Sequence, residues 1–191
     1  MIRRRKRVRW PLRAALLAAA IVGALIAGNG LFMAVKASFG QVLLERAYDS
    51  GGEPWPGADL KALARLEIPK LGEAVIVLDS ATGKAMAWGP GHVRGTVLPG
   101  EPGLSAVGGH RDSHMAFLGK LAPGDEVILE RPGSPSRAFA VTHAEVVDGR
   151  TWRYPAASGG VPRLALTTCW PLGAETPGPL RLIVYADAFP D

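Results

Sequence analysis

The sequence contains one cysteine in 191 residues and lacks internal repeats, heptad patterns and low-complexity blocks. A single cysteine cannot form an internal disulfide, so the fold must depend on an apolar core. Acidic residues are missing from the first 13 positions, and charged residues of either sign are missing from Ala14 to Val35. The length fits one globular domain with an additional segment, and these two regions form that segment.

The uncharged stretch from Ala14 to Val35 has 22 residues, of which only Asn29 is strongly polar. As a helix it would span about 33 Å, which matches the hydrocarbon core of a bilayer. The basic residues before it predict a cytoplasmic N-terminus and an extracytoplasmic domain. A cleavable signal peptide is the alternative, because Val35-Lys36-Ala37 loosely resembles a cleavage site, but signal-peptide cores have roughly 7 to 15 residues. We therefore predict a retained, single-pass anchor in the cytoplasmic (inner) membrane.

The formal net charge of +5 comes from the N-terminal tail, residues 1–13. Seven of the 22 lysine and arginine residues lie in this tail, and the other 15 are balanced by 17 acidic residues. A nucleic-acid partner therefore loses its main support, because such binding needs a basic surface on the domain itself. The basic tail is better explained as a topology signal that contacts anionic lipid headgroups.

Beyond the anchor, the chain divides into a connecting segment and a globular part. We expect residues 36–58 to form a juxtamembrane helix and a Gly/Pro-rich linker, and residues 59–191 to form the domain. In this domain, short apolar or alternating runs are bounded by Gly, Pro and Asp, which is typical of an all-β barrel or sandwich. Two short helical pieces are expected at 80–88 and 114–121. The expected strands are 64–71, 74–79, 103–110, 125–131, 137–148, 163–170 and 180–189.

The cysteine, Cys169, stands at the end of an apolar strand in the stretch RLALTTCWP. Pro171 follows two residues later and stops the strand ladder. Free cysteines are often core residues, so this position alone leaves packing and catalysis equally open. A catalytic thiol needs a nearby imidazole or cation to activate it. Its partner must come from elsewhere in the chain.

Among the four histidines, His110 is the candidate partner. It ends another apolar strand in AVGGHRD, where Gly108 and Gly109 allow close backbone approach. The spacing of His110 and His114 also suits two metal ligands on one helical face, but a turn is expected there and no third ligand clusters with them. We therefore expect no metal and no cofactor. The remaining histidines are His92 and His143, of which His143 lies inside an alternating strand and is expected to be an ordinary surface or core residue.

Arg181 opens the apolar stretch LRLIVYAD, and the Pro- and Gly-rich loop WPLGAETPGP separates it from Cys169. This layout predicts a hairpin-like return that brings Arg181 close to Cys169. A fixed guanidinium there could stabilise an oxyanion or hold a substrate backbone. An arginine that only marks the start of a strand is an equally good interpretation of this residue alone.

Together, GGHR, LTTC and the strand-opening arginine resemble the sortase family, whose signature is a TLxTC motif with an upstream histidine and a downstream arginine on the last barrel strand. The stretch LALTTC matches at Leu166, Thr168 and Cys169 and departs at Ala165, where the family usually has threonine. ARLEIPKLGEAVIVLD resembles the first barrel strands, and HMAFLGKLAPGDEV resembles the helix and turn after the histidine. The resemblance covers about residues 60 to 190 and looks closest to the sortase type of Gram-negative bacteria, which would make the domain periplasmic.

The resemblance implies a closed β-barrel of about eight strands and a membrane-anchored cysteine transpeptidase. Cys169 would attack an LPxTG-like sorting signal near the C-terminus of an exported protein and form a thioacyl-enzyme that an amine acceptor resolves. His110 would act as general acid and base, and Arg181 would hold the substrate or stabilise the oxyanion. The Thr168 hydroxyl could assist at the oxyanion, and Trp170 could line the pocket.

The resemblance also assigns the loop from Val147 to Pro162 to a wall of the substrate site, with Trp152 and Tyr154 as candidate contacts. Three other interpretations stay open. An L,D-transpeptidase fits poorly, because that family expects a Ser-His-Gly-Cys type of site. A hydrolytic cysteine peptidase would use water in place of the amine. A membrane-anchored barrel that only binds a partner would not need His110, Cys169 and Arg181 together.

Overall fold

The computed structural model describes residues 9–155, 159–174 and 176–189, and in the first helix it describes the side chains of residues 13–23 and from Phe39 onward. The chain divides into two compact units, Met1–Ser38 and Phe39–Asp191. The elements are α1 (Arg9–Ser50), β1 (Ala62–Ile68), η1 (Pro69–Leu71), β2 (Glu73–Leu78), α2 (Gly83–Met86), β3 (Gly91–His92), β4 (Gly103–Gly108), η2 (Ala116–Lys120), β5 (Glu126–Glu130), β6 (Arg137–Asp148), β7 (Pro162–Cys169) and β8 (Leu180–Ala188).

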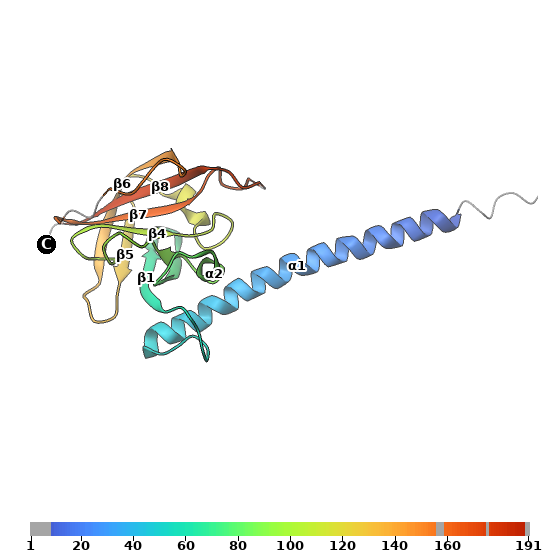
Figure 1. The fold of residues 1–191 in the computed structure, drawn as a ribbon, viewed down its shortest axis with the longest axis horizontal. Helices are drawn as coiled ribbons and strands as arrows, with labels where there is room; N and C mark the ends of the chain where they lie inside the picture. The colour runs from blue at the N-terminus through green and yellow to red at the C-terminus, as the bar shows by residue number, and fades with distance from the viewer. Residues whose placement is uncertain (1–8, 156–158, 175, 190–191) are drawn as a thin grey trace, which may run out of the picture. The chain divides into compact units, whose positions relative to one another are not determined.

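The strands close into a barrel in the order β1-β2-β3-β4-β7-β8-β6-β5 (Figure 1). Pairing of β5 with β1 completes the ring. The β2–β3 and β4–β7 pairs are parallel and the other pairs are antiparallel. The expected all-β class and closed barrel of about eight strands are confirmed. The strand that sequence patterns did not predict is β3, whose two residues are too few to show an alternation.

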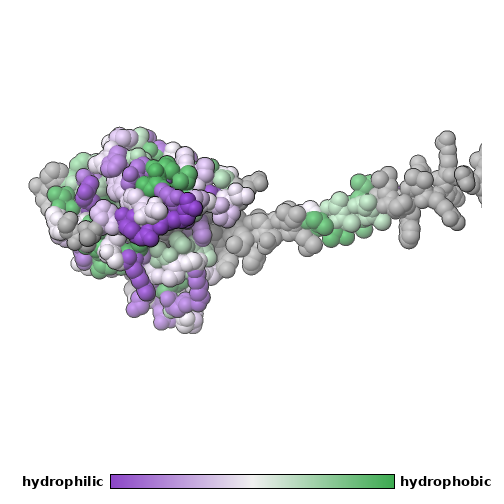
Figure 2. All heavy atoms as spheres, turned by 45° about the horizontal axis from the view of Figure 1, so that its top comes forward, coloured by the Kyte–Doolittle hydropathy of each residue, from purple (hydrophilic) through white to green (hydrophobic). Residues whose placement is uncertain are grey.

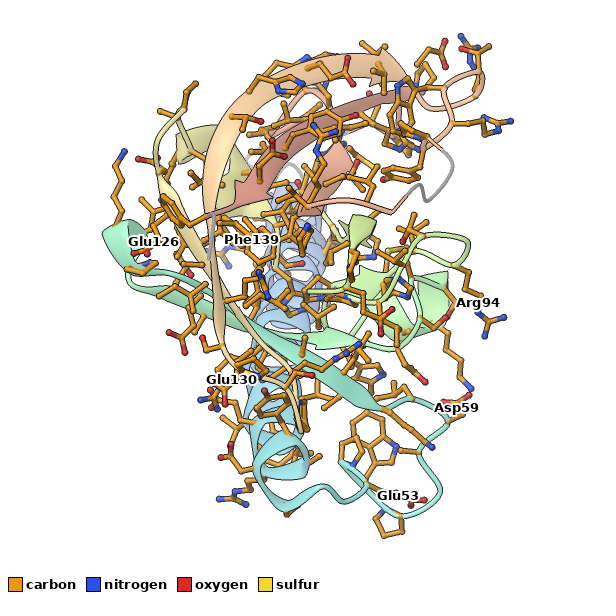
Figure 3. The ribbon with its side chains drawn as sticks, turned by 90° about the vertical axis from the view of Figure 1, so that its left-hand side faces the viewer. Glu53, Asp59, Arg94, Glu126, Glu130 and Phe139 are labelled. Carbon is orange, nitrogen blue, oxygen red and sulfur yellow. The ribbon has the colours of Figure 1, made fainter. Side chains whose placement is uncertain are left out.

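The barrel interior is a single apolar core, to which strands, η2 and the turn before it contribute. Alternation along each strand sends every second residue inward. Phe139 of β6, labelled in Figure 3, is fully buried in this core. Leu164 and Leu166 of β7 are also fully buried, and each stabilises the fold by roughly 1.5–3 kcal/mol through burial. The strand ends that carry the candidate site are therefore held by a packed interior.

The last turns of α1 pack against the barrel. Leu44 and Tyr48 share an apolar cluster with residues of β2, and the Tyr48 hydroxyl donates a hydrogen bond to the carbonyl of Glu130 at 3.0 Å. Gln41 donates to the carbonyl of Trp88 at 2.7 Å and accepts from the amide of Ile76 at 3.1 Å. These contacts explain why the second compact unit begins at Phe39, ahead of the first barrel strand.

The helix α1 includes the predicted membrane-spanning stretch 14–35. Exposed apolar side chains at Leu16, Leu17, Ile21 and Val22 contribute to the green band on the helix in Figure 2. Among the residues that the structure describes, no helix combines the length and the apolarity needed to cross a bilayer. The predicted anchor is therefore not confirmed. The side chains of residues 24–35 of the stretch, and residues 1–8 of the predicted tail, lie outside the described residues.

Candidate active site

Three neighbouring strands, β4, β7 and β8, bring the predicted site residues together. The parallel β4–β7 pair aligns Gly108 with Thr167, and the amide of Gly109 donates to the Thr167 carbonyl at 3.1 Å. His110 lies two residues beyond Gly108, just as Cys169 lies two residues beyond Thr167, so extending this register by two residues would bring His110 close to Cys169. On the other side, the antiparallel β7–β8 pair aligns Cys169 directly with Arg181. Cys169 and Arg181 are thus direct neighbours at the ends of β7 and β8, and His110 follows the end of the strand next to β7.

All three lie on the outer side of the barrel. Leu166 and Thr168 are buried in the interior, so strand alternation turns Cys169 outward. Cys169 is half-buried, and Arg181, its direct partner, is half-buried on the same face. His110 is exposed just beyond the end of β4. A peptide that approaches from outside the barrel can reach all three residues without entering the core.

A groove of about 290 Å³ lies on the outer face and is lined by Arg181, but not by His110 or Cys169. Thr167, which faces the same side as Cys169, and Arg181 form its end toward the cysteine. The β6–β7 connection forms the opposite wall, where the rings of Trp152 and Tyr154 meet edge to face with centroids 4.6 Å apart. The groove is lined by Gly149, Trp152, Arg153, Tyr154, Thr167, Arg181 and Ile183.

Asp148, the last residue of β6, shapes the groove wall. Its carboxylate accepts from the backbone amide of Arg150 at 2.9 Å and from the Arg150 guanidinium at 2.5 Å. These hydrogen bonds lower the pKa of Asp148 to about 2, so it is ionised at neutral pH. The Asp148 carbonyl accepts from the amides of Thr151 and Trp152. The turn that presents Trp152 to the groove is therefore fixed at its first residue.

Arg181 has donors available for a ligand. Its Nη1 donates to the carbonyls of Gly178 and Leu180, both at 2.8 Å. In the part of the chain that the structure describes, no carboxylate lies within salt-bridge distance of its guanidinium. Within the described residues its Nε and Nη2 make no hydrogen bond, so these donors can meet a carbonyl oxygen or an anion in the groove.

Thr168 fastens the end of β7 to the end of β4. Its hydroxyl, which is buried, lies 2.8 Å from the carbonyl oxygen of Gly109. A carbonyl can only accept, so the hydroxyl proton points at Gly109 rather than toward the outer face. Gly109 must be glycine, because a Cβ there would lie 2.6 Å from Cγ of Met115. Trp170, half-buried, packs against the core, and its amide donates to the Leu180 carbonyl at 2.9 Å.

The other three histidines, His92, His114 and His143, are not among the candidate site residues. Buried His92 bonds with the carbonyl of Val97 at 2.9 Å, and exposed His143 stacks on Tyr185 with ring centroids 4.6 Å apart. His114 is buried, and burial, followed by the charge of His110, lowers its pKa. Residues 111–115 form a turn, and the described residues contain no group of three or more metal-ligating side chains.

Residues 66–189 match the family model described as the Sortase domain. The chain belongs to the sortase family. The resemblance carried by GGHR, LTTC and Arg181 is therefore confirmed at the level of the family. The family match covers all of the site described above.

Known sortases are similar to this chain in sequence or in structure. Sortase D of Bacillus subtilis (strain 168) is 27% identical over 121 residues, which is 63% of this chain and 60% of that protein, so the match leaves two fifths of that relative uncovered. Sortase C-1 from Actinomyces oris has a TM-score of 0.60 and 25% identity, over 69% of this chain and 76% of that chain. A Clostridium perfringens Sortase D5 transpeptidase has a TM-score of 0.60 and 21% identity, over 68% and 80% of the two chains.

Proposed function

We propose that this sortase is a cysteine transpeptidase that cleaves a C-terminal sorting signal of exported proteins and joins the protein to an amine. The observation that supports the proposal is the pairing of Cys169 with Arg181 on β7 and β8, next to strand β4, which His110 follows by two residues. A groove lined in part by Arg181 lies on the same face. A nucleophile, a proton carrier and a cation in one row are the groups that acyl transfer needs.

The proposed reaction has two half-reactions. Cys169 passes its proton to His110, and Sγ attacks the scissile carbonyl. The C–S bond forms, the C–N bond breaks, and His110 returns the proton to the leaving amine. An acceptor amine then attacks the thioester and gives its proton to His110, the new C–N bond forms, and the proton passes to the Cys169 sulfur as it leaves. No cofactor is needed for this balance.

The groove suits an extended peptide. The free donors of Arg181 would hold the substrate backbone or the oxyanion, and Trp152 and Tyr154 would contact side chains of an LPxTG-like signal. We assign Thr168 to holding the strand ends in place, since its proton is directed at Gly109. Trp170 would line the entrance next to the nucleophile.

We also propose that residues 14–35 anchor the protein in the cytoplasmic membrane, with residues 1–13 in the cytoplasm and residues 36–58 leading to an extracytoplasmic catalytic domain, 59–191. The apolar composition of the stretch and its basic flank support this topology. Membrane fractionation and protease treatment of spheroplasts test it. A mature protein whose N-terminus begins after Ala37 would contradict the anchor and favour a cleaved signal peptide.

The proposed activity is tested with full-length protein in detergent micelles. Candidate C-terminal peptides are incubated with and without an added amine, and the products are identified by mass spectrometry. We expect one peptide to be cleaved and its N-terminal fragment to be joined to the amine. Cleavage with water addition only, at every amine concentration, would indicate a hydrolytic peptidase. Binding without cleavage of any peptide would indicate a binding module.

A further inference from the structure

Arg111, the residue after His110, is a buried arginine whose hydrogen bonds all reach one loop. Its side chain is 7% exposed. Nη1 donates to the carbonyl of Pro171 at 3.2 Å, and Nη2 donates to the carbonyls of Ala174 and Thr176, the latter at 2.9 Å. These three acceptors belong to the connection between β7 and β8. Only exposed Asp112, 3.6 Å from Nε, offers an opposite charge among the described residues.

A buried guanidinium costs several kilocalories per mole unless its donors are satisfied, so these bonds are a requirement of the fold around it. The loop it holds runs from Trp170, next to Cys169, to Leu180, next to Arg181. At its base, the Trp170 amide donates to the Leu180 carbonyl. Arg111 is thus the link between the end of β4 and the middle of the β7–β8 loop.

We propose that Arg111 is a positioning residue that locks the β7–β8 loop and thereby sets Arg181 against Cys169. It touches none of the reacting atoms. The rigid fork of a guanidinium can serve three carbonyls at fixed angles, whereas a lysine ammonium would serve fewer of them at this reach. The link also connects the segment that carries the proton carrier, His110, to the loop that delivers the cation, Arg181.

The structural part of this proposal is tested without any substrate, by hydrogen exchange in the full-length chain. Arg111→Met and Arg111→Lys are compared with Arg131→Met, which removes a half-buried arginine paired with Glu101 at 3.1 Å elsewhere on the barrel. We expect the amides of Leu172, Gly173, Ala174, Thr176 and Gly178 to exchange at least about tenfold faster in Arg111→Met, less so in Arg111→Lys, and at the parental rate in Arg131→Met. Unchanged exchange in the loop of a folded Arg111→Lys or Arg111→Met protein would overturn the proposal.

The effect of Arg111 on catalysis rests on the proposed function. It is tested by measuring two rates, alkylation and acylation of Cys169, in the same variants. The rate of Cys169 alkylation by iodoacetamide should stay within about threefold of the parent rate, because the thiol and His110 are retained. The rate of acylation by a cleavable peptide should fall about 100-fold, as is typical when a group in the site is misplaced. In a further variant, Arg111→Ala, added methylguanidinium should restore part of the acylation rate. If no peptide acylates the parent protein, the proposed function fails. Hydrogen exchange in the loop then remains the test of whether Arg111 holds the loop. If the parent is acylated and Arg111→Met and Arg111→Lys equal it, the positioning role fails.

Discussion

Strand β7 presents Leu166 and Thr168 to the barrel interior and Thr167 and Cys169 to the groove side. The inward residues are buried and fully engaged, Leu166 by core packing and Thr168 by its bond to Gly109. The outward residues are half-buried, and Cys169 makes no disulfide. Strand alternation separates packing from chemistry by a single position. Substitutions on one face should therefore change stability, and substitutions on the other face should change activity.

The largest effect is expected on the outer face. Cys169→Ala removes the proposed nucleophile, so peptide cleavage should fall to the background rate. Because the side chain is half-buried and the change is small, the free energy of unfolding should stay within about 1 kcal/mol of the parent. Cleavage assays and urea denaturation on the same preparation check both halves. Cleavage by Cys169→Ala at the parental rate would show that the outer face of β7 does not carry the nucleophile.

The next largest effect is expected in the interior, at Leu166. Leu166→Ala leaves a cavity in the core and should lower the free energy of unfolding by about 2–5 kcal/mol. Leu98→Ala, at an exposed leucine, is the control and should cost about 0.5 kcal/mol or less. At temperatures where Leu166→Ala remains folded, its Cys169 should still be acylated. An acylation defect in the fully folded variant would show that the two faces are not independent.

A smaller effect is expected from the hydroxyl that fastens the strand ends. Thr168→Val keeps the shape of the side chain but leaves the Gly109 carbonyl without this donor, so the free energy of unfolding should fall by about 1–2 kcal/mol. Thr167→Val is the matched control one position away, where the hydroxyl donates to Leu182 in a half-buried site. Urea denaturation should show the greater loss for Thr168→Val. An equal loss of unfolding free energy in the two variants would show that the inward hydroxyl of Thr168 is no more important for stability than the outward hydroxyl of Thr167.

The smallest effect concerns pH and His114, which lies behind the site. Burial first, and His110 second, lower its pKa in the folded protein, so the unfolded chain takes up the proton before the folded chain does as pH falls. Its contribution to stability is therefore complete above the ordinary histidine pKa and is lost as pH falls below it. Denaturation between pH 8 and pH 5 should show a shallower pH dependence for His114→Gln. The same dependence in both proteins would contradict this assignment.

Local patterns were enough to predict most of the barrel. Alternation and bounding Gly and Pro residues located seven strands, and the order GGHR, LTTC, Arg181 identified the family. Strand β3 was missed because two residues carry no periodicity. The packing of Tyr48 on the barrel was missed because it depends on contacts with residues far along the chain.

The candidate residues could be named from the sequence, but their geometry could not. Its strand ends are visible in the sequence, whereas the parallel pairing of β4 with β7 joins residues about sixty positions apart and leaves no local signal. Arg111 stands next to His110 in GGHRD, yet nothing in that stretch indicates burial. Its burial follows from the return of the β7–β8 loop over it, which only the folded chain reveals.

A trapped acyl-enzyme would show directly that Cys169 is the nucleophile. Full-length protein is incubated with a cleavable sorting peptide without an acceptor amine, and the adduct is located by intact mass and peptide mapping. We predict one acyl group on Cys169, which hydroxylamine removes and which forms about 10²–10⁴ times more slowly in His110→Gln. An adduct on another residue, or one that forms at the parental rate in His110→Gln, would contradict the account.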